Sequence, residues 1–188
     1  NNNRYEEAEK EYKEALGIKR ELAATNPSAY LPDVAGVLNN LGLLHSDNNR
    51  YEEAEEEYKE ALEIRRELAA ANPSAYLPDV ADTLNNLGNL HQINNRYEEA
   101  EKEYEEALGI RRELAATNPS AYLPDVATTL TSLGILHSNN NRYDEAEEEY
   151  KEALEIFEEF AKFAPAAFQP KVEIVQNCFD ELMGRSSD

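Results

Sequence analysis

The chain has only one cysteine, no tryptophan and no apolar run long enough to span a membrane. The single cysteine, Cys178, excludes an internal disulfide and fits a reducing compartment, so we expect a cytoplasmic protein. A transmembrane helix needs about 20 mainly apolar residues, which argues against a membrane protein. Basic residues are also scarce: 18 Lys and Arg against 39 Asp and Glu leave a net charge of -21. Nucleic acids and anionic membranes both attract positive surfaces, so this charge argues against either as a partner.

The chain also lacks the motifs that mark most active sites. It has no P-loop, no glycine-rich phosphate cradle and no nucleophile motif. The only obvious catalytic or metal-binding candidates are His45, His91 and His137, which stand 46 residues apart. Packed helices lie about 8–10 Å apart, whereas zinc holds its nitrogen ligands at about 2.1 Å, so the three cannot share one ion. We therefore predict packing roles for the histidines, no enzyme activity, no metal site and no cofactor.

What the chain does contain is a repeat with a period of 46 residues. Arg4, Arg50, Arg96 and Arg142 each open the segment R-Y-(E/D)-E-A-E, and the first three of these segments are followed by L-P-D-V-A. A period in this range is typical of a solenoid, whose core runs between neighbouring repeats.

Each repeat predicts two helices. In the unit that begins at Leu77, apolar and small residues recur at steps of three and four, which predicts a first helix of about 16 residues with Pro78 in its first turn. The preceding N-P-S-A-Y-L then serves as a linker. Asn94 and Asn95 close this helix, because asparagine tolerates the left-handed conformation. A second helix of about 21 residues starts near Tyr97. Small residues on both helices permit close helix approach, namely Gly88, Ala100 and Ala107.

These residues resemble the tetratricopeptide repeat. The match is carried by L-x-x-L-G-x-x-H on the first helix and Y-x-x-A-x-x-x-Y-x-x-A on the second, that is, by Leu84, Leu87, Gly88, His91, Tyr97, Ala100, Tyr104 and Ala107. The long unit is similar to the repeats of kinesin light chain and its bacterial relatives. The resemblance implies an all-α, right-handed α-solenoid of antiparallel helix pairs. For function it implies only the binding of a protein or peptide.

On this pattern we expect a single repeat domain over residues 1–188. Residues 1–30 form a second-type helix without its first-type partner, residues 31–76, 77–122 and 123–163 form helix pairs, and residues 164–188 form a capping helix. The last helix, expected over residues 170–183, carries Gln176, Phe179 and Asp180 where its predecessors carry Leu, Leu and Gly. Losing this glycine fits a helix on which no further helix packs. The aromatic residues from Phe157 to Phe163 then form the core of the cap.

The helix expected over residues 1–30 lacks the first-type helix that precedes it in a full repeat, so part of its apolar face should be uncovered. Either the array continues upstream or another molecule covers this end. We expect a weak homodimer or end-to-end association through this strip, which consists of Ala8, Tyr12, Ala15 and Leu16.

The repeats differ mainly along one stripe. Residues 50–95 and 96–141 differ at 10 of 46 positions, and six of these, at 82, 85, 86, 89, 92 and 93, share one face of the first helix. The resemblance implies that this face lines a concave groove. Amide side chains there can both donate to and accept from an extended peptide. The predicted groove residues are Asn39, Asn40, Leu43, Asp82, Asn85, Asn86, Asn89, Gln92, Ile93, Thr128, Thr131, Ile135 and Ser138.

The type of ligand is constrained by what this face lacks. Residues 31–49, 77–95 and 123–141 contain no Lys or Arg, whereas relatives that grip a terminal carboxylate carry such residues here, which argues against a carboxylate clamp. The nearest basic residues are the pairs Arg65–Arg66 and Arg111–Arg112 on the longer helix, and two alternatives stay open, that they reach the edge of the groove or that they do not. The alternative is neutral drift at exposed positions, in which case the chain is a structural, designed or consensus repeat scaffold with no ligand of its own.

Overall fold

The computed structural model describes residues 2–185, and within them every regular element is an α-helix. The eight helices are α1 (Asn2–Thr25), α2 (Pro27–Asp47), α3 (Tyr51–Ala71), α4 (Pro73–Ile93), α5 (Tyr97–Thr117), α6 (Pro119–Asn139), α7 (Tyr143–Phe163) and α8 (Pro165–Arg185). The all-α prediction is confirmed. Within this described part, no helix is both long and apolar enough to cross a membrane.

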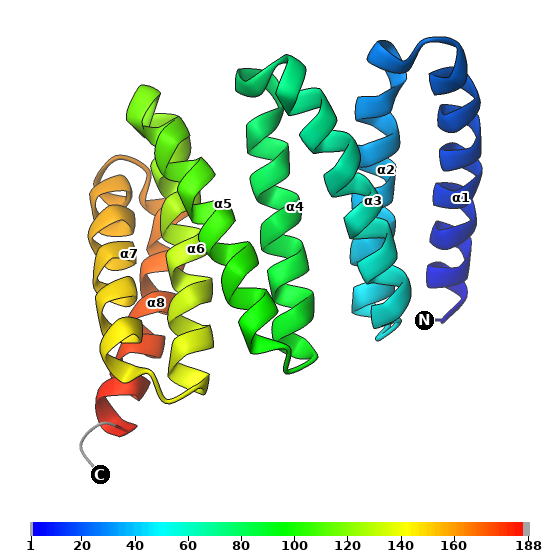
Figure 1. Cartoon of the computed structure of the whole chain (residues 1–188). Coiled ribbons are helices and arrows are strands. Elements are labelled where there is room, and N and C mark those ends of the chain that lie inside the picture. The colour runs from blue at the N-terminus through cyan, green and yellow to red at the C-terminus, as the bar shows by residue number, and fades with distance from the viewer. Residues whose placement is uncertain (1, 186–188) are drawn as a thin grey trace. The chain divides into compact units, whose positions relative to one another are not determined.

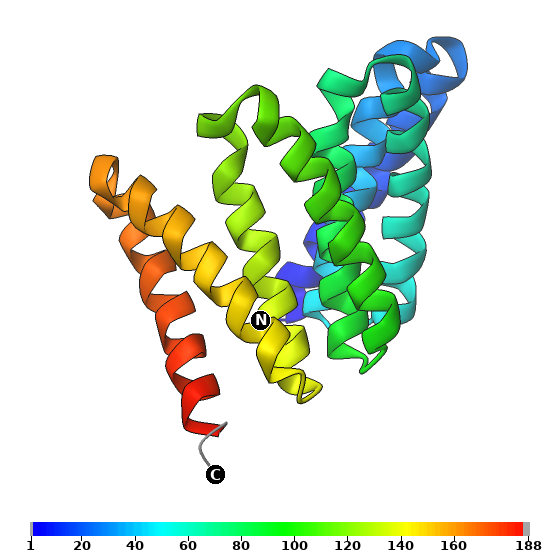
Figure 2. The same ribbon diagram turned by 60° about the vertical axis from the view of Figure 1, so that its left-hand side comes forward.

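The chain divides into two compact units, Asn1–Asn94 with α1–α4 and Asn95–Asp188 with α5–α8. In each unit, consecutive helices pack side by side in antiparallel pairs (Figures 1 and 2). We call α2, α4, α6 and α8 first-type helices and α1, α3, α5 and α7 second-type helices. The assignment of residues 1–188 to a single domain, with repeats ending at 76, 122 and 163, stays a prediction.

The first-type helices begin earlier than the periodicity predicts. The N-P-S segments are helix starts and not linkers, because Asn26, Asn72 and Asn118 occupy the N-cap and the following proline takes the first helical turn. Proline suits that position, since its fixed φ matches the helix and its missing N–H would have no partner there. The helices are therefore 21 residues long, and the proline expected in the first turn, such as Pro78, lies inside the helix.

The turns that follow the first-type helices confirm the predicted role of asparagine. Asn49, Asn95 and Asn141 have φ values of 60°, 58° and 58°, in the left-handed region that asparagine tolerates better than most residues. Each also accepts a hydrogen bond from the tyrosine two residues later, for example at 2.6 Å between Tyr51 Oη and Asn49 Oδ1. The turn thereby fixes the start of the next helix.

Helices approach closely where tyrosine stacks on glycine. A Cβ atom added at Gly42 would lie 2.8 Å from Tyr58 Cε1, and one added at Gly134 would lie 2.5 Å from Tyr150 Cε1. Both tyrosines are almost completely buried, and so are Ala100 and Ala107 of α5. The small residues thus serve the close packing that the sequence predicted.

The last helix covers the end of the second unit. Val175 and Leu182 are buried against the core that contains Phe157, and Phe168 lies 6.4 Å from Phe157 between ring centroids. Phe163 is 87% exposed, so its predicted place in the core of the cap is wrong. The helix also begins at Pro165 and not near residue 170, because Pro165 takes the first helical turn as the prolines of the other first-type helices do, although Ala164 stands where those helices have asparagine.

At the start of the first unit, the predicted apolar strip of α1 is only partly covered. Ala8, Tyr12 and Ala15 are half-buried, whereas their repeat equivalents in α3 are fully buried. Leu16 differs from the prediction, because it is buried in the core between α1 and α2. The uncovered strip instead includes Ile18, which is 59% exposed.

We expect weak self-association through this strip, stronger at high salt because salt screens the repulsion between acidic copies. Sedimentation at low and high salt measures it, and Tyr12→Glu should abolish it. Lys10→Gln makes the same change in net charge on an exposed part of α1 and should leave association unchanged. A strict monomer in both salts, or equal effects of the two substitutions, contradicts this prediction.

Candidate peptide-binding face

In the first unit, the predicted groove residues of α2 and α4 meet. Asn86 Nδ2 of α4 donates a hydrogen bond to Asn39 Oδ1 of α2 at 3.2 Å. Asn40 and Asn89 are exposed on the same two helices, and Leu43 is 49% exposed although it is apolar. The face therefore combines amide groups with apolar side chains that water reaches.

An arginine of α3 lies beneath this face. Arg65 Nη1 donates to the backbone oxygen of Asp79 at 3.0 Å, to Thr83 Oγ1, and more distantly to Asn39 Oδ1 at 3.5 Å. The side chain is buried, and this burial lowers the pKa of Arg65 against the opposing effect of nearby acids. Sequence reasoning placed Arg65 near the groove without deciding whether it reaches it; the structure shows that it bridges α2 and α4 from below.

In the second unit, α6 carries the hydroxyl groups of Thr131 and Ser132 where α2 carries the amides of Asn39 and Asn40. Thr128 Oγ1 donates to the Pro124 oxygen at 2.9 Å, and Thr131 Oγ1 donates to the Ala127 oxygen at 2.7 Å. These hydroxyls use their protons within their own helix, so they offer only acceptors and methyl groups to a ligand. Among the other predicted residues, Ile135 is half-buried and Ser138 is buried.

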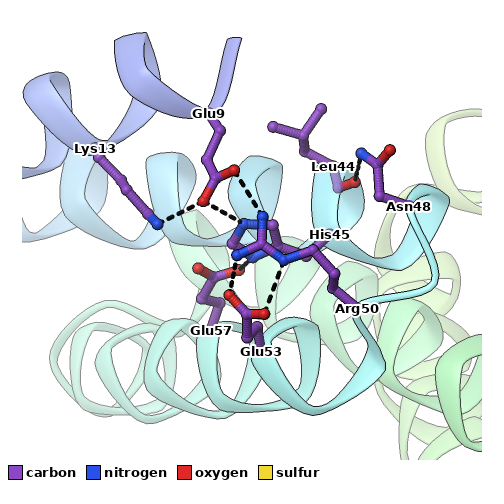
Figure 3. A network of polar contacts seen from close by, with 8 residues as sticks. All are labelled: Glu9, Lys13, Leu44, His45, Asn48, Arg50, Glu53 and Glu57. Atoms are coloured by element: carbon purple, nitrogen blue, oxygen red, sulfur yellow. Dashed lines mark hydrogen bonds and ion pairs between the residues drawn. The ribbon is translucent and has the colours of Figure 1, made fainter. Parts of the chain in front are cut away.

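The three histidines lie at the interfaces between helices. His45 is fully buried, with Nδ1 2.7 Å from Glu57 Oε2 of α3 and Nε2 3.3 Å from Glu9 Oε1 of α1 (Figure 3). His137 repeats this arrangement, 2.9 Å from Glu149 and 3.1 Å from Glu101. Each of these two histidines connects the second-type helices on either side of it.

His91 follows the same pattern at one of its nitrogens. Its Nε2 lies 3.2 Å from Glu55 Oε1 of α3. The predicted packing role is thus supported by geometry at all three positions. The glutamate partners could not be identified from the sequence, because each repeat contains many similar glutamates.

A metal-like cluster surrounds His45, but cations of the protein already occupy it. Ligand atoms of Glu9, His45 and Glu53 lie within 4.8 Å of one another. Arg50 donates to both glutamates, and Lys13 Nζ donates to Glu9 at 2.5 Å (Figure 3). The hydrogen bonds from Arg50 and then Lys13 lower the pKa of Glu9 to about 2. A bound cation would have to displace these charge-assisted contacts.

We expect zinc to show no saturable binding in isothermal titration calorimetry, because Arg50 and Lys13 neutralise the carboxylates of this cluster. Unfolding temperature should likewise be unchanged by added zinc. Saturable binding by the wild-type chain that disappears in His45→Gln would contradict this prediction and identify a metal site.

We also expect a pH-dependent contribution from His137. Burial alone lowers the pKa of this histidine, but hydrogen bonds with Glu149 and Glu101 outweigh it and raise the pKa above its ordinary value, while Arg142 opposes them. The folded state then holds the proton of His137 more tightly than the unfolded chain does. The stabilisation is therefore fully present below about pH 6.5, and it is lost as the pH rises through the pKa of His137 in the folded state.

Thermal unfolding of the wild type and of His137→Gln at about pH 6 and about pH 9 measures this contribution. The wild type should lose more stability than the variant over this range. Burial raises the pKa of the neighbouring Glu149, which also lowers stability as the pH rises. Burial would raise the pKa of Glu101 as well, but the hydrogen bond from Arg142 outweighs it and the pKa of Glu101 is lowered. Identical pH dependence in both proteins would rule out the contribution.

Comparisons with known proteins agree with this architecture. The family model described as Tetratricopeptide repeat matches residues 33–113 and 79–159, and a second model with the same description matches residues 1–22. Among solved structures, the chain is similar to the crystal structure of BtubC (BKLC) from P. vanneervenii, with a TM-score of 0.55 and 20% sequence identity over 97% of this chain and 91% of that chain. This likeness concerns the fold alone. No curated protein sequence matches the chain. Because the first model spans more than half of its residues, the chain belongs to the tetratricopeptide repeat family.

Proposed function

We propose that this chain is a non-catalytic, cytoplasmic interaction module that holds an extended peptide on the face of its first-type helices. Tetratricopeptide repeats indicate a protein-interaction or scaffold module. The observation that carries the more specific proposal is the stripe of six differences between otherwise similar repeats, which coincides with the face where Asn39 meets Asn86.

The chemistry of this face suits a peptide backbone. Amides both donate and accept hydrogen bonds, as do backbone N–H and C=O groups. Leu43 and Ile93, which is 56% exposed, provide apolar surface for side chains between those polar contacts. The absence of Lys and Arg from residues 31–49 and 77–95 disfavours a terminal carboxylate as the main anchor in the first unit.

The repeats themselves supply a matched test. A face-swap variant places at 82, 85, 86, 89, 92 and 93 the residues found 46 positions later, and a scaffold-swap variant does the same at 56, 59, 63 and 71. Peptides selected from a random extended library against the wild type are then titrated with both variants. The face swap should weaken binding by about tenfold or more, and the scaffold swap should change it by less than about twofold.

Chemical-shift changes on adding a selected peptide should map to α2 and α4 or to α6 and α8. A library that yields no peptide dependent on this face overturns the proposal and supports a structural scaffold without a ligand. For a peptide whose shift changes map to α2 and α4, equal effects of the two swaps overturn the proposal as well, because binding would then not depend on the residues of this face.

A further inference from the structure

A small cavity lies between α6 and α8 on the proposed peptide-binding face of the second unit. Its volume is about 200 Å³, and its lining includes Thr128 and Thr131 of α6, Phe157 of α7, and Lys171, Ile174 and Val175 of α8. Sites for whole small molecules usually measure about 300–1,000 Å³, so this cavity suits one side chain and not a complete cofactor.

The chemistry of this cavity differs from that of the equivalent place in the first unit. Between α2 and α4, the position of Phe157 is held by the buried Arg65, and the positions of Lys171 and Val175 are held by Asp79 and Thr83. The place between α2 and α4 therefore has Arg65, a hydrogen-bonded cation, as its floor. It also has the acidic Asp79 where the cavity has Lys171. At the end of the second unit, the floor is apolar and the rim is basic.

Lys171 is the cation of this rim, and it forms no ion pair with any residue in the described part of the chain. Its Nζ atom lies 5.3 Å from the ring centroid of Phe157 and 5.7 Å from that of Phe168. The aromatic faces attract the ammonium group but leave its hydrogen-bonding capacity open. In a chain of net charge -21, this leaves a cation beside an apolar cavity without a carboxylate partner.

The other walls of the cavity are mostly apolar. Ile174 is exposed at its edge, and Val175 and Phe157 are buried lining residues. The hydroxyl protons of Thr128, Thr131 and Ser132 are directed to backbone oxygens of α6. An apolar group entering the cavity would therefore leave no protein donor without a partner. A cationic group would meet Lys171 and be repelled.

We propose that this cavity binds one aliphatic side chain of an extended peptide and that Lys171 pairs with a carboxylate on the adjacent peptide residue. The inference rests on the proposed peptide-binding function and adds its specificity. The second unit thus selects an apolar residue next to an acidic one, whereas the first unit, with Arg65 as its floor and Asp82 on its face, does not offer this combination.

Four Gly/Ser peptides test the inference, each carrying one central pair: Leu-Glu, Leu-Gln, Leu-Lys or Ala-Glu. They are titrated to millimolar concentration into the full chain and followed by the amide shifts of Thr131 and Ile174. The Leu-Glu peptide should bind about tenfold or more tightly than the Ala-Glu peptide, because the leucine side chain is buried. Among the leucine peptides, affinity should fall from Leu-Glu to Leu-Gln and then to Leu-Lys.

Two substitutions decide the role of the lysine. Lys171→Glu should reverse the preference, so that the Leu-Lys peptide binds better than the Leu-Glu peptide. Lys162→Glu makes the same charge change at an exposed position of α7, where Lys162 pairs with Glu159, and should preserve the preference. Thr131→Leu, which narrows the cavity, should reduce the advantage of leucine over alanine.

Equal binding of the four peptides, no shift at Thr131 or Ile174, or equal effects of the two lysine substitutions would overturn the inference. These failures differ from failure of the proposed function. A library peptide that responds to the face swap in α4 but ignores Lys171→Glu leaves peptide binding intact and removes only the assigned specificity.

Discussion

Replacing Gly134 by alanine is expected to lower the free energy of unfolding of the second unit by about 1–3 kcal/mol. Alanine is the better helix former by about 1 kcal/mol, so a destabilising effect would run against intrinsic propensity. The reason is steric: a Cβ atom at this position would lie 2.5 Å, 2.7 Å and 3.0 Å from three atoms of the Tyr150 ring. That ring is buried between helices and cannot move away without disturbing the core.

Gly109 provides the control for this prediction. It also lies inside a helix, but an added Cβ atom would have no neighbour within 4 Å. Gly109→Ala should therefore stabilise the chain by up to about 1 kcal/mol. Urea unfolding followed by circular dichroism measures both changes, and stabilisation by both substitutions would show that propensity outweighs the tyrosine contact.

These two glycines also show what the sequence reveals about the fold. The periodicity of apolar and small residues placed Gly88, the repeat equivalent of Gly134, at a helix interface, because only one face of each helix can contact its neighbours. It did not place the helix starts correctly. The N-P-S segments looked like linkers since they carry no apolar periodicity, yet Asn118 and Pro119 supply the N-cap and first-turn residues that begin α6.

The candidate face was predictable to the level of its helix positions. A stripe of differences identifies one face of a helix, and the structure shows that Asn39 and Asn86 meet there. The sequence did not reveal which side chains from other helices lie beneath this face. Arg65 reaches it because long side chains extend several ångströms from their own helix, and this reach depends on how the helices pack.

The cavity beside Lys171 was missed for a related reason. With the last helix expected over residues 170–183, Lys171 stood at its very start, and nothing in the sequence placed it over Phe157. Because α8 begins at Pro165, Lys171 is held within the helix and lies over Phe157. Comparing positions 157, 171 and 175 with their equivalents 92 residues earlier would have supplied the signal, since all three change chemical class together.

Removal of α8 is the other change for which we expect a large effect. Deleting residues 164–188 should uncover Phe157 and Tyr150, which are buried with Val175 and Leu182 in one core cluster. Exposed apolar patches of this kind promote association. The truncated chain should therefore lose solubility or form oligomers, and its unfolding temperature should fall.

A single substitution tests the same contact without removing any backbone. Leu182→Ala is expected to cost about 2–5 kcal/mol, because it deletes buried methyl groups from the interface of α8 with the core. Met183→Ala changes the next residue, which is exposed, and should stay within about 0.5 kcal/mol of the wild type.

Since α8 carries Lys171 and Ile174, Leu182→Ala should also weaken binding of the Leu-Glu peptide, whereas Met183→Ala should not. Chemical denaturation, sedimentation and peptide titration measure these effects. If the truncated chain remains monomeric with an unchanged unfolding temperature and Leu182→Ala matches Met183→Ala, then α8 neither closes the core of the second unit nor supports the cavity.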